Sequence, residues 1–145
     1  MTQHILSIAG LLGATIFMLL SVLHFHWALG GKYGYANSLP MNEKGETVLH
    51  PKKRDSAIVG FGLFSFSIIY LVKSELLNIN LPSIVSNYGL WLIVVIFLLR
   101  AVGDFKYVGF FKKIRFTNFA EMDSKFYAPL CLFLAFIGVF IELYN

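Results

Sequence analysis

The chain alternates long apolar blocks with short polar segments. The apolar blocks cover about residues 5–29, 56–73, 88–110 and 125–144. A bilayer core about 30 Å thick needs about 20 helical residues to cross it, so each block has roughly the length of a membrane-spanning helix. The pattern therefore predicts an all-α fold, an integral membrane four-helix bundle in which residues 1–145 form a single transmembrane domain.

A cleaved signal peptide is the alternative interpretation of the first block. Such a peptide carries positive charge before its apolar run, and that run is usually about 7–15 residues long. In this chain no Lys or Arg precedes Lys32, and the apolar run is longer. The first block is therefore predicted to be retained as a membrane span.

The third block contains charged residues. Its uninterrupted apolar part, residues 88–99, would cover about 18 Å as a helix, which is too short to cross a bilayer. The preceding segment 82–87 contains Pro, Ser and Asn, which favour a turn. The missing length is therefore expected on the other side, so that the span reaches about residue 110 and includes Arg100 and Asp104.

Arg100 and Asp104 are four residues apart, which would place them on one face of such a helix. An ionisable residue inside a span is costly and is a functional-site candidate by default. The alternative is that Arg100 extends to the cytoplasmic interface and pairs with Asp104 for structural reasons only. The two interpretations are compatible with each other.

The composition supports the membrane class. Hydrophobic residues make up 57% of the chain and charged residues 14%, whereas a soluble domain is typically about 45–50% apolar and about 25% charged. The mean hydropathy is +0.70. With Cys131 as the single cysteine, an intramolecular disulfide and a CxxC redox pair are excluded, and Cys131 is expected to be a packing residue.

The distribution of positive charge predicts the orientation. Two groups of Lys and Arg lie next to the apolar blocks, one in the loop 30–55 and the other around the loop 111–124: Lys32, Lys44, Lys52, Lys53, Arg54, Lys106, Lys112, Lys113, Arg115 and Lys125. Cytoplasmic loops carry such an excess. We therefore expect a multi-pass protein of the inner (plasma) membrane with both termini outside. Nucleic acid is not expected as a partner, because the positive residues flank apolar spans.

The first block ends in two histidines that are two residues apart. His24 and His26 would point to nearly opposite sides of a helix, and His24 shares its face with Phe17 and Ser21. His24 is therefore the better inward candidate, while Trp27 suits the membrane interface. The alternative is that both histidines only form interfacial hydrogen bonds. The sequence has no HxxxH or HxxEH pattern, so neither a metal site nor a cofactor is predicted.

Polar residues of the other blocks are expected at the same depth as His24. Asp123 precedes the fourth block as a possible helix cap, and Tyr127 would lie just inside the cytoplasmic face. The simplest arrangement is a polar cavity that opens toward the cytoplasm. Its candidate residues are His24, Asp55, Arg100, Asp104, Asp123 and Tyr127.

Three segments carry a resemblance: HFHWALGG from His24, LRAVGDFKYVGFFKK from Leu99 and FAEMDSKFYAPLCL from Phe119. Together they resemble a bacterial family of small four-span integral membrane proteins classed as a domain of unknown function. His26 departs from the family pattern, which more often has Tyr there. The resemblance implies no established activity. The residues that match the pattern are His24, Trp27, Gly30, Gly31, Arg100, Gly103, Asp104, Gly109, Phe110, Phe111, Lys112, Asp123, Tyr127, Pro129, Leu130 and Cys131.

Three functions are consistent with these features. The first is binding or transport of an amphipathic or anionic small ligand, with membrane lipid as the surrounding partner. The second is a membrane enzyme acting on a lipid-like substrate, with His24 as general base oriented by Asp123 or Asp104. The third is an accessory membrane subunit whose polar groups only fix the bundle. The expected ligand-binding residues are His24, Trp27, Arg100, Asp104, Asp123 and Tyr127.

Overall fold

The computed structural model describes residues 2–145, and this part of the chain is helical without strands. Four helical stretches are long and apolar enough to cross a membrane, which confirms the predicted all-α fold. The fourth stretch is divided by a short π-helical segment. The elements are α1 (Thr2–Ala28), a 3-10 helix (Ala36–Ser38), α2 (Lys53–Lys73), α3 (Ser83–Val102), α4 (Asn118–Met122), the π-helical segment (Asp123–Tyr127) and α5 (Ala128–Tyr144).

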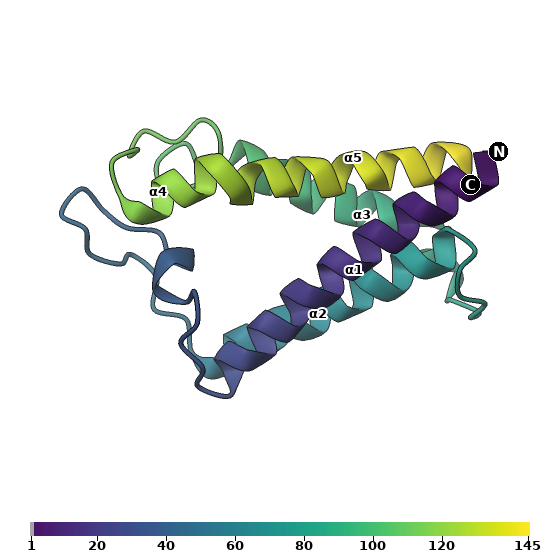
Figure 1. The fold of residues 1–145 in the computed structure, drawn as a ribbon, viewed down its shortest axis with the longest axis horizontal. Coiled ribbons are helices and arrows are strands. Elements are labelled where there is room, and N and C mark those ends of the chain that lie inside the picture. The colour runs from purple at the N-terminus through teal and green to yellow at the C-terminus, as the bar shows by residue number, and fades with distance from the viewer. Residues whose placement is uncertain (1) are drawn as a thin grey trace.

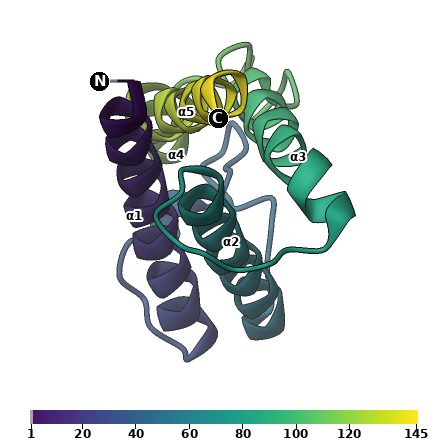
Figure 2. The same cartoon turned by 90° about the vertical axis from the view of Figure 1, so that its right-hand side faces the viewer.

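The four long helices form two pairs that diverge. Helix α1 packs along α2, and α3 packs along α5. The pairs meet at the end of the molecule that holds both termini and separate toward the opposite end (Figure 1). We call these the narrow end and the wide end. Figure 2, viewed from the narrow end, shows α1 and α2 on one side and α3 and α5 on the other.

The loops are divided between the two ends. The first loop, residues 29–52, and the α3–α4 loop, residues 103–117, lie at the wide end (Figure 1). The α2–α3 loop, residues 74–82, lies at the narrow end together with the termini. The two loops that carry most of the Lys and Arg residues therefore share one end of the molecule.

Tyr70 is the centre of the contact between the pairs. Its ring packs where α1 and α5 both have glycine: a Cβ on Gly13 would lie 2.6 Å from the Tyr70 ring, and one on Gly138 would lie 2.7 Å from its Oη. The same Oη donates a hydrogen bond to the carbonyl of Leu134 at 2.8 Å. Small residues allow helices in a membrane to approach closely, so these glycines create the space that Tyr70 fills.

Two serines connect α1 with α2. Ser21 Oγ donates to the carbonyl of Gly60, and Ser67 Oγ donates to the carbonyl of Ala14, both at 2.8 Å. Both serines are buried. A hydroxyl in an apolar setting needs a partner, and these two find theirs on the facing helix, which stabilises the α1–α2 pair along its length.

An aromatic cluster marks the place where the pairs begin to diverge. The Phe17 ring lies edge-to-face against Tyr70 at 5.0 Å and against Phe97 at 5.1 Å between centroids. Phe66 adds a third ring at 5.8 Å from Phe17. Edge-to-face contacts are favourable beyond the buried area alone, so this cluster joins α1, α2 and α3 firmly at this level.

An ion pair links α2 with α5 at the narrow end. Lys73 Nζ at the end of α2 lies 3.0 Å from Glu142 Oε2 on α5, and both side chains are largely buried. Lys73 Nζ also donates to the carbonyl of Ser86 on α3 at 3.3 Å. Three of the four long helices are thus linked through a single ammonium group.

The prediction that the third helix extends forward to residue 110 is wrong. Helix α3 begins at Ser83, directly after Pro82, and ends at Val102. Proline is tolerated at a helix start because the N–H it lacks would have no helical partner there. Gly103, with φ of +86°, leaves the helical conformation at the other end. The length needed for a span therefore comes from residues before 88, and Asp104 lies outside the helix. The other three helices also begin earlier than predicted.

Candidate functional site

A buried carboxylate is the centre of the polar groups at the wide end. Asp123 lies at the start of the π-helical segment and has no solvent exposure. Its Oδ1 accepts a hydrogen bond from Arg100 Nη2 at 2.9 Å. Its Oδ2 accepts from Lys112 Nζ at 3.0 Å and from the Gly109 N–H at 2.7 Å. A buried charge is tolerated when it is paired and hydrogen-bonded in this way.

Lys112 is buried more completely than its sequence position would imply, with 2% of its surface exposed. Besides Asp123, its Nζ donates to the carbonyl of Gly109 at 2.9 Å and to Ser124 Oγ at 2.7 Å. An ammonium group has three hydrogens, and here each has an acceptor. Lys112 alone therefore offsets the negative charge of Asp123, and Arg100 adds a positive charge that no second carboxylate balances.

Asp104 shapes the loop that brings Gly109 and Lys112 to Asp123. Its Oδ1 accepts hydrogen bonds from the backbone N–H groups of Lys106, Tyr107 and Val108 at 2.7–2.9 Å. Burial raises the pKa of the Asp104 carboxyl, but hydrogen bonds from these three backbone donors and from the N–H of Asp104 itself together lower it more, so that its pKa lies below the ordinary value. Asp104 is thus a loop-forming residue that stays ionised.

Two glycines allow the α3–α4 loop to close. Gly103 and Gly109 have φ values of +86° and +87°, which glycine adopts without strain. A Cβ on Gly103 would collide with the carbonyl of Val108, and one on Gly109 would collide with the carbonyl of Val102. The loop therefore folds back on the end of α3, where the N–H of Phe110 donates to the carbonyl of Ala101 at 2.8 Å.

The predicted pairing of Arg100 with Asp104 is wrong. The expectation assumed a continuous helix, in which residues four apart share a face, but α3 ends between the two residues. Arg100, in the last turn of α3, pairs instead with Asp123. Asp104 is exposed and belongs to the surface of the loop.

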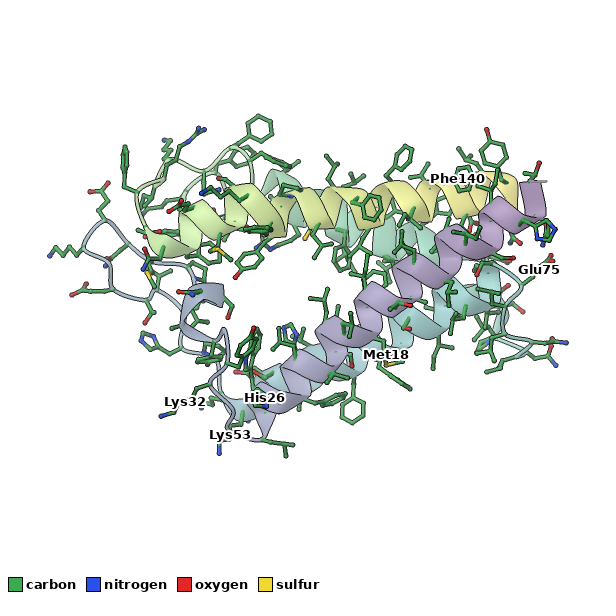
Figure 3. The ribbon with its side chains drawn as sticks, viewed as in Figure 1. Met18, His26, Lys32, Lys53, Glu75 and Phe140 are labelled. Atoms are coloured by element: carbon green, nitrogen blue, oxygen red, sulfur yellow. The ribbon has the colours of Figure 1, made fainter. Side chains whose placement is uncertain are left out.

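A cavity of about 800 Å³ lies between the helix pairs at the wide end, next to Arg100. It begins on the wide-end side of the aromatic cluster, where Phe97 and Leu63 contribute to its wall. Figure 3 shows that the side chains of the two pairs do not fill the space between them. The polar and aromatic side chains in its wall are His24, Trp27, Tyr33, Tyr35, Asn37, Ser38, Asp55, Ser56, Arg100 and Tyr127.

His24 and Trp27 form the part of this wall contributed by α1. His24 Nδ1 lies 2.8 Å from the carbonyl of Leu20. Because a carbonyl only accepts, this bond places the proton on Nδ1 and leaves Nε2 as an acceptor. The ring contacts Trp27, whose Nε1 donates to the carbonyl of Tyr33 at 2.7 Å. His26 is exposed on the other side of α1, as the spacing of the two histidines predicted.

The first loop covers the cavity at the wide end. Tyr35, Asn37 and Pro51 of this loop contribute to the cavity wall, and Tyr35 Oη donates to the carbonyl of Pro51 at 3.1 Å. On the opposite side, Tyr127 Oη donates to the carbonyl of Asn37 at 3.3 Å. The loop thus begins and ends on the α1–α2 pair and contacts the α3–α5 pair through Tyr127.

Arg100 is the charged group of the wall whose hydrogen-bonding capacity is least used. Its side chain is 33% exposed, and its single hydrogen bond within residues 2–145 is the one from Nη2 to Asp123. Nη1 is buried, and no residue in that range accepts from it. A guanidinium has five N–H donors, and among residues 2–145 Arg100 uses one of them.

Four of the six predicted ligand-binding residues therefore line one cavity: His24, Trp27, Arg100 and Tyr127. Asp123 contacts the cavity only through Arg100, and Asp104 lies outside it.

A family model described as "Protein of unknown function (DUF3995)" matches residues 17–137. The chain belongs to this family. No curated protein and no solved structure matches it.

The match confirms the resemblance of the chain to a family of unknown function. The matched segment begins at the aromatic cluster and continues through both loops of the wide end into α5. It therefore contains the whole cavity and the Asp123 cluster of this DUF3995 protein, and it leaves out residues 2–16 of α1 and the end of α5 from Gly138.

Sequence reasoning missed the part that Lys112 and Gly109 play at Asp123. Lys112 was expected as a loop residue at the cytoplasmic boundary, because a basic residue after a span usually marks that boundary. The spacing of Gly103 and Gly109 around Asp104 was the available signal, since two glycines flanking an aspartate favour a tight loop over a helix. The contribution of the first loop to the cavity had no comparable signal.

The structure does not assemble the predicted catalytic pair. His24 bonds to Leu20, while the Asp123 carboxylate is occupied by Arg100, Lys112 and Gly109. A general base oriented by a carboxylate is therefore not formed by His24 with Asp123 or with Asp104. Within residues 2–145, no three His, Cys, Asp or Glu side chains lie together in a way that would hold a metal ion.

Proposed function

We propose that this DUF3995 protein binds an amphipathic small ligand in the wide-end cavity and holds an acceptor group of the ligand, such as a carboxylate or phosphate, on Arg100. The observation that carries the proposal is Arg100 in the cavity wall, whose side chain is 33% exposed and makes one hydrogen bond within residues 2–145. A hydrogen bond from such a charged group to a ligand acceptor contributes about 1.5–3 kcal/mol.

The net charge of Arg100, Lys112 and Asp123 favours a ligand with an anionic group. Asp123 is the single carboxylate bonded to Arg100 and Lys112, so the three side chains together carry one positive charge. Apolar side chains, including Phe97, Leu63 and Leu130, also contribute to the cavity wall. Such a wall lowers the local dielectric constant and strengthens the attraction between a guanidinium and an anion.

The size of the cavity supports a small molecule rather than a protein partner. Ligand pockets typically enclose about 300–1,000 Å³ and are mostly apolar with a few fixed polar groups. The wide-end cavity has a volume of about 800 Å³ and the same mixture. Transport and retention of the ligand both belong to the proposal.

The proposed setting is the inner membrane, with the wide end toward the cytoplasm. The support is the sharing of one end by the two loops rich in Lys and Arg, because cytoplasmic loops carry such an excess. In this orientation the cavity lies at the level of the cytoplasmic leaflet.

Binding can be tested with a dansyl-labelled fatty acid and the purified protein in a neutral detergent. The expected result is saturable binding that Arg100→Gln weakens about tenfold or more, because a hydrogen bond to a charged group contributes about 1.5–3 kcal/mol. Arg54→Gln is the matched control, since Arg54 is exposed on α2. Val59→Trp, which fills the cavity without touching Asp123, is expected to abolish binding as well.

The proposal fails if the probe does not bind the wild-type protein, or if Arg100→Gln and Arg54→Gln bind it equally. Arg100→Gln also removes a partner of Asp123, so the melting temperature of each variant is measured in parallel. Val59→Trp then decides the case if Arg100→Gln does not fold.

A purely structural role is the second candidate. It is favoured by one observation, the complete hydrogen-bonding of Lys112 and Asp123. Buried ionic groups of this kind can define a single arrangement of helices without any ligand. Unaltered biological activity of Val59→Trp would favour this candidate over ligand binding.

A further inference from the structure

On α1, α2, α3 and α5, the wall of the wide-end cavity changes from polar to apolar in the direction of the narrow end. On α1, Trp27 and His24 are followed toward the narrow end by Leu20, over a distance of about 10 Å. On α3, Arg100 is followed by Phe97. A ligand with a polar head and an apolar tail therefore fits in one orientation, with the head at the wide end.

The α2 and α5 sides show the same gradient. On α2, Asp55 and Ser56 lie nearest the wide end, and Leu63 lies nearest the aromatic cluster. On α5 and the turn before it, Tyr127 precedes Leu130. Four helices with the same direction of polarity match the direction of a lipid in the leaflet at the wide end.

The cavity is covered at its end but not along its sides. The first loop crosses the wide end and is joined to the other helix pair by the bond from Tyr127 to Asn37. The helix pairs themselves meet near the narrow end, where Tyr70 packs against Gly13 and Gly138. From there they diverge toward the wide end (Figures 1 and 3). In a membrane the sides of a helix bundle face lipid, while its ends face water.

We propose that the occupant of this cavity is a lipid-like amphiphile with an anionic head group, which enters sideways from the leaflet at the wide end. The head group, a phosphate or carboxylate, is held by Arg100, and the tail extends along Leu20 and Leu63 toward Phe97. This inference rests on the proposed binding function and adds the source of the ligand, the direction of entry and the orientation in the site. A free anion from water is the competing source of the same chemistry.

Photocrosslinking in nanodiscs separates these sources. The full chain carries p-benzoylphenylalanine either at Val59, which lines the cavity, or at the neighbouring Ile58, which is exposed on the outside of α2. The nanodiscs contain equal amounts of phosphatidylcholine and phosphatidylglycerol. Each variant is also made with Arg100→Gln and, as the matched control, with Arg54→Gln.

The expected result is an excess of phosphatidylglycerol over phosphatidylcholine of about tenfold at Val59 and no such excess at Ile58. Both lipids carry a phosphate that Arg100 can bind, but the choline of phosphatidylcholine adds a positive charge beside the net positive Arg100, Lys112 and Asp123 side chains, which disfavours it. Arg100→Gln removes the excess at Val59, whereas Arg54→Gln keeps it. Inorganic phosphate added before irradiation does not reduce the amount of phosphatidylglycerol captured at Val59.

Two results would overturn the inference. Capture at Val59 in the same lipid ratio as at Ile58 means that no selective lipid site exists. Loss of capture when inorganic phosphate is added before irradiation means that the anion comes from water. Both leave the proposed function intact if the fatty-acid probe still depends on Arg100. Should the Val59 photoprobe variant not fold, the lipids retained by the wild-type protein and by Arg100→Gln and Arg54→Gln in native mass spectra make the same comparison.

Discussion

A single carboxylate, Asp123, determines how the residues at the wide end are arranged. It joins the end of α3 through Arg100, the α3–α4 loop through Gly109 and Lys112, and the start of the fourth span through its own backbone. The π-helical turn at Asp123 widens the helix locally. Such turns occur frequently at functional sites, and here the turn lies next to the cavity wall.

Lys112→Met is expected to destabilise the protein strongly. The substitution leaves Asp123 buried with one cation fewer, and breaking a buried pair from one side costs about 3–5 kcal/mol. Thermal unfolding in detergent measures the loss. Lys113→Met is the control, because Lys113 is the exposed neighbour, and it should melt close to the wild type. Recovery of part of the loss in Lys112→Met/Asp123→Asn would support the charge explanation, and equal melting of the two single variants would contradict it.

Asp104 gives a pH-dependent prediction. Because its pKa is lowered in the folded protein, its charged form stabilises the fold at pH values above the ordinary carboxyl pKa, about 4. This contribution is lost as the pH falls through the lower folded pKa. The melting temperature of the wild type should therefore exceed that of Asp104→Asn at neutral pH, and the difference should shrink at acid pH. A difference independent of pH would show that ionisation of Asp104 does not matter.

The α3–α4 loop depends on glycine at the scale of the element. Gly109→Ala is expected to cost more than about 1 kcal/mol, since alanine is strained at positive φ and its Cβ meets the carbonyl of Val102. Gly62→Ala is the matched control within α2, where a Cβ has no neighbour within 4 Å and alanine favours the helix by up to about 1 kcal/mol. Thermal unfolding of both variants in the same detergent tests the contrast, which would be refuted by equal losses.

The number of long helices could be predicted from sequence because apolar block length is a local property. The ends of α3 could not, because Pro82 and Ser86 are equally acceptable in a turn and in a first helical turn. Choosing the wrong end moved Asp104 into the helix and gave Arg100 the wrong partner. His24 was placed correctly because helical spacing alone decides which of two nearby histidines shares a face with Phe17.

A polar cavity could be predicted from residues that share one depth, but its volume and its partly apolar wall could not, because they depend on how far the two helix pairs diverge. Divergence depends on contacts between distant residues, such as Tyr70 with Gly13 and Gly138, which no local pattern reveals. The contribution of the first loop is likewise a matter of tertiary structure. The sequence correctly indicates that these polar residues lie at one end of the molecule, but it does not indicate the volume between the helix pairs.

The orientation of the whole molecule can be tested by cysteine labelling in intact cells. Cys131 is first replaced by serine, and a single cysteine is then introduced at Lys44 in the first loop or at Asn78 in the α2–α3 loop, both exposed. A membrane-impermeant maleimide should label the Asn78→Cys variant and not the Lys44→Cys variant until the cells are opened. The reverse pattern would place the wide end outside.

Because the helix pairs separate toward the wide end, a small rotation of one pair against the other would change the distance between them there. The pairs are fastened at the narrow end by the Lys73–Glu142 ion pair and by Tyr70. Across the wide end, within residues 2–145, Tyr127 donates a hydrogen bond to the Asn37 carbonyl, and the 3-10 helix of the first loop packs on α4. From Phe17 to Ala28, α1 extends about 16 Å beyond the aromatic cluster. A rotation of about 5° at that cluster would move the far end of α1 by about 1.4 Å over this length, so the width of the opening can change while the packing inside each pair stays intact.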